Sequence, residues 1–313
     1  MNEILVSICI PTYNRCQLLT KTINSIICQN EFVEGKAEII ISDNASTDDT
    51  EKIGRDFESK FDNIHYYRNE ENVRDENYPL CISRANGVLR KLNNDTLMFE
   101  HNALKVLCDL VEKYRIDKPY IFLKNDDGKG SSETDFIKFV TEEGYNITWI
   151  GSFSIWDSQC KNIQNDTKGC DLLLWQVRKL LELSSSSNRV IICHEKIGKS
   201  EHPPKKNISY GLYKVFYINF MKLIEPYVVN GKLTTDNVEK IEKDLLYDFF
   251  TQWIIKWEVG KNDLQYSKEE NLKELVFSQY KEKPYFNHYK KLYNKKKMIY
   301  KAKLIIKRIL GMN

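Results

Sequence analysis

Short apolar runs alternate with amphipathic helical patterns along the first hundred residues. Residues 4–10 form an apolar run that ends at Pro11, which is typical of a strand buried on both faces of a parallel sheet. Apolar residues at helical spacing over 17–29 then predict an amphipathic helix. The pattern continues with strands at 38–42 and 64–68 and a helix at about 77–86. This order predicts an open, mostly parallel α/β sheet.

The pattern changes near residue 205. Before that point we expect further strands at 88–92, 120–123, 148–155 and 190–193 and helices at 103–114 and 171–183. From about 208 the spacing is helical, near 212–226, 234–258 and 287–310. The sequence therefore predicts an α/β domain at 1–205 and a helical C-terminal extension at 206–313.

Composition places the chain among globular proteins. Hydrophobic residues make up 42% and charged residues 29%, which argues against wholesale disorder. The eight cysteines include no Cys-x-x-Cys pair and several lie in apolar patterns, which predicts reduced thiols in a cytoplasmic protein. No signal sequence precedes the first strand and no run reaches the roughly 20 apolar residues of a membrane span. We therefore expect neither secretion by a signal peptide nor a transmembrane segment.

Two polar turns follow the first two strands. Pro-Thr-Tyr-Asn-Arg at 11–15 and Asp-Asn-Ala-Ser-Thr-Asp-Asp-Thr at 43–50 would meet at the carboxyl ends of parallel strands, where such sheets bind ligands. Together with Ala-Asn-Gly at 85–87, these turns resemble the family 2 glycosyltransferases, which are inverting enzymes with the GT-A fold. The resemblance covers about 4–110 well and 145–200 loosely.

The resemblance implies a nucleotide site. It implies that Pro11, Tyr13 and Asp43 contact uracil or another base, and a carboxylate that accepts from an imide N–H beside a packed aromatic ring agrees with this. The alternative is that these residues only shape a turn and cap a helix. Arg84 could face the diphosphate or lie solvated on its helix.

A metal site is implied as well. GT-A enzymes hold a divalent cation, Mn²⁺ or Mg²⁺, in an Asp-x-Asp-like turn, and the matching segment here is Asn93-Asn94-Asp95. Asp95 would ligate the cation, and Asn93 would supply an amide oxygen or an indirect contact. The missing second carboxylate puts metal dependence in doubt, and Asp95 could instead cap a helix. The acidic pair Asp126-Asp127 fits the family spacing less well and is expected in an exposed loop.

The resemblance also implies a general base at the start of a later helix. Asp171, followed by an apolar helical stripe, matches that position, although an N-cap aspartate would look the same. Asp157 and Asp166 are alternatives. Tryptophans at 149, 156 and 175 could stack on sugars or fill the core. Among the histidines, His194 is expected in the core and His202 could approach the phosphates.

The last segment, 287–313, is basic and amphipathic. Between Lys290 and Arg308 lie eight lysines and one arginine, and no acidic residue follows Glu282. Such a helix suits an anionic membrane surface. It could also pack on the domain or on a second copy in a homo-oligomer. No recognition motif accompanies the charge, so nucleic acid is not expected as a partner.

These features predict a glycosyltransferase that moves a sugar from a nucleotide donor, UDP-linked by preference, to a hydroxyl of a bacterial surface glycan or a lipid-linked acceptor. One alternative is a non-catalytic nucleotide- or sugar-binding protein, favoured by the incomplete metal turn. The other is a nucleotidyltransferase, which normally needs a glycine-rich loop after the first strand, and residues 11–19 contain no glycine.

Overall fold

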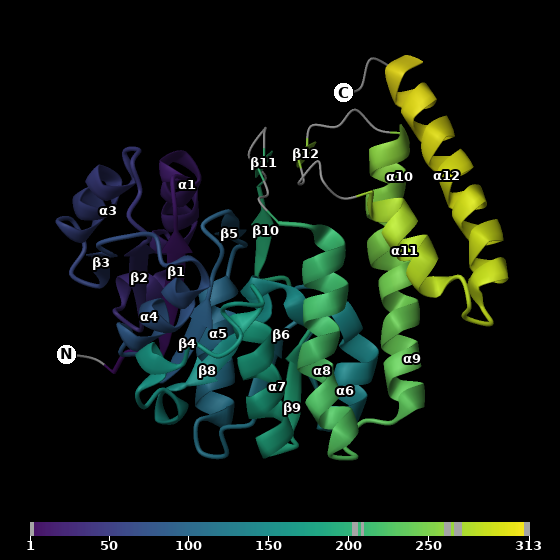
Figure 1. Ribbon diagram of the computed structural model, residues 1–313. Coiled ribbons are helices and arrows are strands. Elements are labelled where there is room, and N and C mark those ends of the chain that lie inside the picture. The colour runs from purple at the N-terminus through teal and green to yellow at the C-terminus, as the bar shows by residue number, and fades with distance from the viewer. Residues whose placement is uncertain (1–2, 202–205, 208–209, 260–263, 266–270, 310–313) are drawn as a thin grey trace. The chain divides into compact units, whose positions relative to one another are not determined.

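The computed structural model describes residues 3–201, 206–207, 210–259, 264–265 and 271–309. The chain divides into two compact units, one of residues 1–140 and 146–203, the other of 141–145 and 204–313. Figure 1 shows that sheets flanked by helices make up the first unit and that helices dominate the second. The short segment 141–145, which the sequence pattern did not single out, belongs to the helical unit.

The central sheet confirms the predicted α/β fold. Its strands are β1 (Val6–Thr12), β2 (Ala37–Asp43), β3 (Ile64–Arg68), β4 (Leu89–Leu92) and β8 (Ser154–Trp156), in the order β3-β2-β1-β4-β8. The first four strands run parallel, and β8 joins antiparallel to β4. All the predicted ligand-binding turns after β1, β2 and β4 therefore lie at one edge of this sheet.

Both faces of the central strands are buried, as their continuous apolar runs predict. On one face, Val6, Ile8 and Ile10 join a hydrophobic cluster with residues of α1 (Cys16–Ile27) and α5 (Ala103–Tyr114). On the other face, Gly87 donates its N–H to the Ser7 Oγ at 2.7 Å. A Cβ on Gly87 would lie 2.5 Å from that oxygen, so the backbone approach requires glycine there.

A second sheet lies beyond β8. It consists of β6 (Tyr120–Leu123), β9 (Val190–Cys193) and β7 (Ser131–Thr134), with β9 in the middle. The Ser154 Oγ donates to the Ile121 carbonyl at 2.7 Å and thereby connects β8 to β6. A two-stranded ribbon pairs β5 (Leu97–Phe99) with β10 (Gly198–Ser200). The strand expected over 148–155 is shorter than predicted, because 150–152 forms a 3₁₀ turn.

The remaining helices of the first unit are α2 (Asn30–Val33), α3 (Thr50–Glu58), α4 (Asn77–Ser83), α6 (Phe136–Glu143), which continues into the second unit, and α7 (Trp175–Ser187). The helix expected at 171–183 begins four residues later than predicted. Its N-cap position is Leu174, so the suggestion that Asp171 caps this helix is wrong. The serine run at 184–187, expected as a separator, is the last turn of α7.

The second unit contains α8 (Phe220–Val229), α9 (Thr235–Asp244), α10 (Thr251–Val259), α11 (Leu272–Tyr280) and α12 (Phe286–Ile309), with π-helical turns at Lys214–Asn219 and Leu245–Phe250. Short strands β11 (Lys206–Asn207) and β12 (Leu264–Gln265) pair in parallel. Three helical stretches were predicted here, whereas α11 was not. Within the described residues, none of the helices has the length and apolar character that a membrane crossing needs.

Candidate nucleotide and catalytic site

The turns after β1 and β2 are locked to each other. Thr12 and Asp43 are partners in the parallel register, so the two turns begin side by side. The Asn14 N–H donates to the Ser46 Oγ at 2.8 Å, and the Asn14 Oδ1 accepts from the Thr47 N–H at 2.7 Å. Asn14 has φ +51°, a conformation that asparagine adopts more readily than most residues. The two motifs therefore form one rigid polar edge of the sheet, which we call the polar edge.

The first turn contains two candidate base-binding residues, Tyr13 and Pro11, which are exposed to different degrees. Tyr13 has 43% of its surface exposed, and Pro11 is half-buried. An exposed tyrosine ring beside a fixed backbone is suited to pack against a planar ligand. This arrangement is compatible with the predicted base contact.

Asp43 is a buried carboxyl group held by three donors. Its Oδ1 accepts from the Ser46 N–H at 2.9 Å, and its Oδ2 accepts from the Tyr66 hydroxyl at 2.6 Å and from Arg68 at 3.2 Å. Burial, followed by the hydrogen bond to Asp43, raises the pKa of Tyr66 far above its ordinary value, so the hydroxyl stays a donor. A carboxylate offers about four acceptor positions, of which these donors fill three on a side chain that is fully buried.

Arg84 lies at the same edge, at the end of α4. Its guanidinium donates to the Ser42 Oγ at 2.5 Å and to the Asn69 Oδ1 at 2.8 Å, and it stacks on the Tyr67 ring 5.0 Å from the centroid. No carboxylate lies within ion-pair distance of it in the described part of the chain. Burial lowers the pKa of Arg84 from its ordinary value. A half-buried cation without an anionic partner is a suitable place for a phosphate.

Asp95 is anchored in the turn after β4. Its side chain is 2% exposed, and its two oxygens accept from the Thr12 Oγ1 at 2.8 Å and from Arg15 at 2.7 Å. The next helix, α5, begins only at Ala103, so the helix-capping interpretation of Asp95 is wrong. The turn therefore brings a carboxylate to the Pro-Thr-Tyr-Asn-Arg motif across some 80 residues of sequence.

Asn93 lies inside the fold beneath this turn. It is fully buried, and its Oδ1 accepts from the Lys91 Nζ at 2.8 Å. Its amide donates to the carbonyls of Asn94 at 2.9 Å and Leu97 at 3.1 Å. Of the two roles predicted for Asn93, support of the turn agrees with these contacts better than direct ligation.

The described residues contain no group of three or more His, Cys, Asp or Glu side chains that could hold a metal ion by themselves. The turn after β4 supplies the single carboxylate of Asp95. Mg²⁺ sites for phosphorylated substrates commonly use one or two carboxylates and complete the shell with phosphate oxygens and water. The residues present fit such a shared site and do not fit an all-protein one.

Asp171 lies in an exposed turn ahead of α7. It has no hydrogen-bond or ion-pair partner in the described structure, and the turn contains Gly169 and Leu173 at positive φ. The neighbouring thiol of Cys170 has its pKa raised to about 12, first by burial and then by the charges of Asp75 and Glu76. These two acids belong to the 3₁₀ turn η1 (Arg74–Glu76), which Asn44 holds at the edge of the sheet. Asp171 therefore belongs to a segment close to the polar edge.

The two alternative bases are engaged elsewhere. Asp166 pairs with Arg178 at 2.5 Å and with Lys179 at 3.3 Å. Asp157 follows β8 at the opposite end of the sheet from the two turns, because its N–H donates to the Val88 carbonyl ahead of β4, and it pairs with Lys118 at 2.7 Å. Neither carboxylate lies open at the polar edge.

Asp75 lies next to the polar edge, in a turn that Asn44 holds there, and the sequence did not single it out. Burial raises its pKa to about 7, and its Oδ2 is buried without a hydrogen-bond partner. The residue lies among polar neighbours in the sequence, and no local pattern signals its burial. Its surroundings come from the fold, since Cys170, which is distant in the sequence, lies close enough for the charge of Asp75 to raise the pKa of its thiol.

The aromatic and histidine candidates separate by burial. Trp156 and Trp175 are buried to 1% and 0% exposure and fill the core, whereas Trp149 is half-buried. The prediction of a core environment for His194 is wrong, because its ring, about a quarter exposed, contacts Asp126 at 3.2 Å and the Ser132 hydroxyl at 2.8 Å. The remaining candidate, His202, lies outside the described residues.

The part of the sequence that forms the turns after β1 and β2 is similar to a known family. Residues 7–88 match the sequence model of glycosyl transferase family 2. The abequosyltransferase RfbV of Salmonella typhimurium is 45% identical over 85 residues, which are 26% of this chain and 25% of RfbV. The glycosyltransferase AglE of Haloferax volcanii is 33% identical over 83 residues, 26% of this chain and 25% of AglE. The chain thus matches about a quarter of the length of these relatives.

Structural comparison extends over nearly the whole chain. The S. aureus TarS fragment 1–349 in complex with UDP-GlcNAc has a TM-score of 0.57 at 15% identity, and the alignment covers 98% of this chain and 92% of that one. At this identity the likeness shows the fold alone. The fold is that of the GT-A glycosyltransferases, as the resemblance of the two turns to that family implied.

Proposed function

We propose that this chain is a family 2 glycosyltransferase, an inverting enzyme that uses a UDP-sugar, because residues 7–88 match the sequence model of that family and the fold is of the GT-A type. The observation that carries the proposal is the locked pair of turns after β1 and β2, which lies within the family-matched segment. The TarS structures with UDP-GlcNAc and with UDP support a uridine donor by analogy of fold.

The polar edge would bind the nucleotide as follows. Tyr13 and Pro11 pack against the uracil ring, and Asp43 accepts from a base N–H. Arg84 donates to the diphosphate, which gives its half-buried guanidinium the anionic partner that the described residues do not provide.

Asp95 would hold a divalent cation, either Mn²⁺ or Mg²⁺, together with the diphosphate oxygens. Arg15 currently neutralises this carboxylate and would exchange its partner when a cation binds. A bound cation neutralises charge on the departing diphosphate. Thr12 keeps the other Asp95 oxygen in place, and Asn93 supports the turn from beneath.

Asp171 would act as the general base. It takes the proton of the acceptor hydroxyl while that oxygen forms a bond to the anomeric carbon, the bond from this carbon to the diphosphate breaks, and UDP leaves from the opposite face. An exposed carboxylate without a protein partner, in a turn near the nucleotide edge, supports this role.

We propose a bacterial surface glycan or a lipid-linked glycan as the acceptor, since the abequosyltransferase RfbV is among the relatives.

The helix α12 supports the proposal that the enzyme acts at a membrane surface. Its first half packs into the helical unit through Phe286, Tyr289 and Tyr293. Its second half, from Met298 to Ile309, exposes apolar side chains next to lysines that have no ion-pair partner among the described residues.

Nucleotide release over a panel of UDP-, GDP- and dTDP-sugars tests the proposal. We expect release of UDP from at least one UDP-sugar, enhanced by Mn²⁺ or Mg²⁺. The competing function is a nucleotide-binding protein without activity, which the single carboxylate of the Asp95 turn favours. Tight UDP binding without turnover of any donor would favour that alternative.

A further inference from the structure

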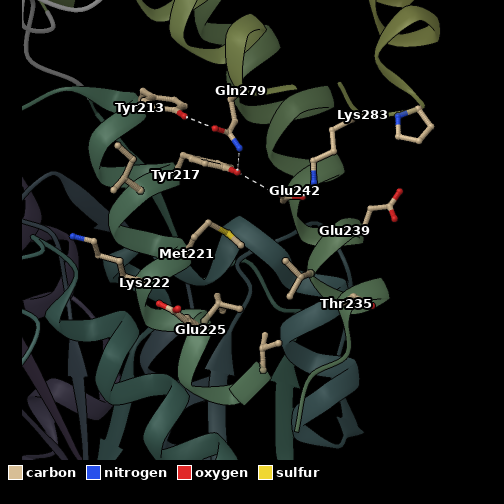
Figure 2. Close-up of a pocket in the computed structure, with 15 residues that line it drawn as sticks. Tyr213, Tyr217, Met221, Lys222, Glu225, Thr235, Glu239, Glu242, Gln279 and Lys283 are labelled. Atoms are coloured by element: carbon tan, nitrogen blue, oxygen red, sulfur yellow. Dashed lines mark hydrogen bonds and ion pairs between the residues drawn. The ribbon is translucent and has the colours of Figure 1, made fainter. Parts of the chain in front are cut away.

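A cavity of about 790 Å³ opens in the helical unit, apart from any residue assigned above. It lies between the π-helical turn Lys214–Asn219 with α8, the helix α9, and the segment that joins α11 to α12 (Figure 2). Cavities of roughly 300–1,000 Å³ are the size in which proteins bind small ligands. The volume is therefore sufficient for a short oligosaccharide or a similar molecule.

One end of the cavity is a fixed polar network. The Tyr213 hydroxyl donates to the Gln279 Oε1 at 3.1 Å, and the Gln279 amide donates to the Tyr217 hydroxyl at 2.6 Å. Tyr217 in turn donates to the Glu242 Oε1 at 2.7 Å, while the Lys283 ammonium donates to the Glu242 Oε2 at 2.5 Å. Figure 2 shows these five side chains converging at that end. Because Glu242 and both tyrosines are nearly buried, the network is held in one geometry.

The network keeps hydrogen-bonding capacity for a ligand. Gln279 uses one of its two amide N–H groups, and Lys283 uses one of its three ammonium N–H groups. Gln279 is exposed and Lys283 is a third exposed, so both can donate to a hydroxyl oxygen from the cavity. The polar end can therefore bind hydroxyl groups without breaking an existing hydrogen bond.

Much of the remaining lining is apolar. Met221 of α8 is half-buried, and its side chain is labelled in Figure 2. Ile218, which is 39% exposed, and Val238 also line the cavity. An apolar wall that faces a hydroxyl-binding end matches a pyranose, which has a C–H face and hydroxyl edges. A simple acyl chain would leave the polar end unused.

The charges of the lining offer no particular attraction to an anionic ligand. Glu242 pairs with Lys283, and Glu239 pairs at 3.0 Å with Lys243, which lies outside the lining. Glu225 and Lys222 then balance each other, so the lining has no excess positive charge that would attract a nucleotide or a phosphate. An uncharged sugar needs no such charge.

We propose that this cavity is a binding site for uncharged sugar units of the acceptor glycan, separate from the nucleotide site. The inference rests on the proposed function, which supplies the glycan. It assigns to the helical unit the task of holding part of the acceptor chain.

Saturation-transfer NMR tests the proposal on the full chain, with cellobiose, lactose and N,N′-diacetylchitobiose as sugar probes, 1-decanol as an apolar probe and UDP as a donor-site probe. Met221→Trp fills the cavity, and Met298→Trp makes the same change on α12, where the side chain is 66% exposed. Gln279→Leu, at an exposed position, removes the amide without filling the cavity.

We expect at least one disaccharide to bind the wild type and Met298→Trp, and to bind Met221→Trp and Gln279→Leu about tenfold more weakly, which corresponds to about 1.4 kcal/mol. UDP should bind all four proteins alike. The proposal is overturned if no disaccharide binds, if Met221→Trp leaves sugar binding unchanged, or if only 1-decanol binds. If the wild type does not bind UDP, that result would instead contradict the proposed function.

Discussion

Replacement of Arg84 with methionine should separate phosphate recognition from base recognition. The substitution keeps side-chain length and removes the charge. The guanidinium now donates to Ser42 and Asn69 and stacks on Tyr67, without a carboxylate in ion-pair distance in the described structure. The variant loses these hydrogen bonds but no longer buries a cation without an anionic partner. We therefore expect the free energy of unfolding to fall by less than about 2 kcal/mol.

The effect on the nucleotide should be larger. A hydrogen bond to a charged group contributes about 1.5–3 kcal/mol, which corresponds to about a 10- to 150-fold change in Kd. Titration calorimetry should therefore show UDP bound more weakly to Arg84→Met by that factor. Uridine, which has no phosphate, should bind the variant and the wild type alike.

The matched control is Arg55→Met. Arg55 stacks on Tyr66 with its guanidinium 5.1 Å from the ring centroid, as Arg84 does on Tyr67, but it pairs with Glu51 at 3.0 Å. This variant should keep the affinity for UDP. Equal weakening of UDP and uridine by Arg84→Met, or an unchanged affinity for UDP, would refute the assignment of Arg84 to the diphosphate.

Four further predictions follow from the described contacts. Asp171→Asn should lower turnover about 10²- to 10⁴-fold with an unchanged Kd for UDP; near-normal turnover would exclude this base. Asp95→Asn should abolish the gain in UDP affinity that Mn²⁺ produces, as measured by calorimetry with and without Mn²⁺. A gain that persists in the variant would contradict the cation site. Because the folded pKa of Asp75 is about 7 and its ordinary value is 3.8, the free energy of unfolding should fall by up to about 4 kcal/mol as pH rises from about 4 to 7 and then level off. Urea unfolding should show a smaller fall for Asp75→Asn; an identical profile would show that Asp75 does not titrate this way. Deletion of 298–313 should reduce co-sedimentation with phosphatidylglycerol vesicles and leave UDP binding intact, whereas equal co-sedimentation would contradict the membrane role of α12.

The central sheet could be predicted because its signals are local. Apolar runs at 4–10 and 38–42 have the length and composition of strands buried on both faces, and both strands form. The late segments were harder. The apolar and small residues of 148–155 were predicted to form a strand, whereas 150–152 forms a 3₁₀ turn and β8 covers only Ser154–Trp156. The start of α7 was also misplaced, because the helix was predicted from Asp171 and begins at Trp175.

The candidate site could be predicted only in part, since its contacts connect distant segments. The motif around Pro11 pointed to a ligand-binding turn, but nothing near Arg15 indicates that it pairs with Asp95. Asp75 was missed for the same reason, because its burial depends on the folded chain and its electrostatic neighbour Cys170 is distant in the sequence. Local patterns identify the turns, whereas the electrostatic partners depend on the folded chain.

The most direct test of the central claim is a crystal structure of the protein with UDP and Mn²⁺. We predict uracil against Tyr13 and Asp43, the diphosphate at Arg84, and Mn²⁺ between the diphosphate and Asp95, with Arg15 released from its present partner. A nucleotide bound away from the turns after β1 and β2, or a fully occupied nucleotide that contacts none of these residues, would contradict the account.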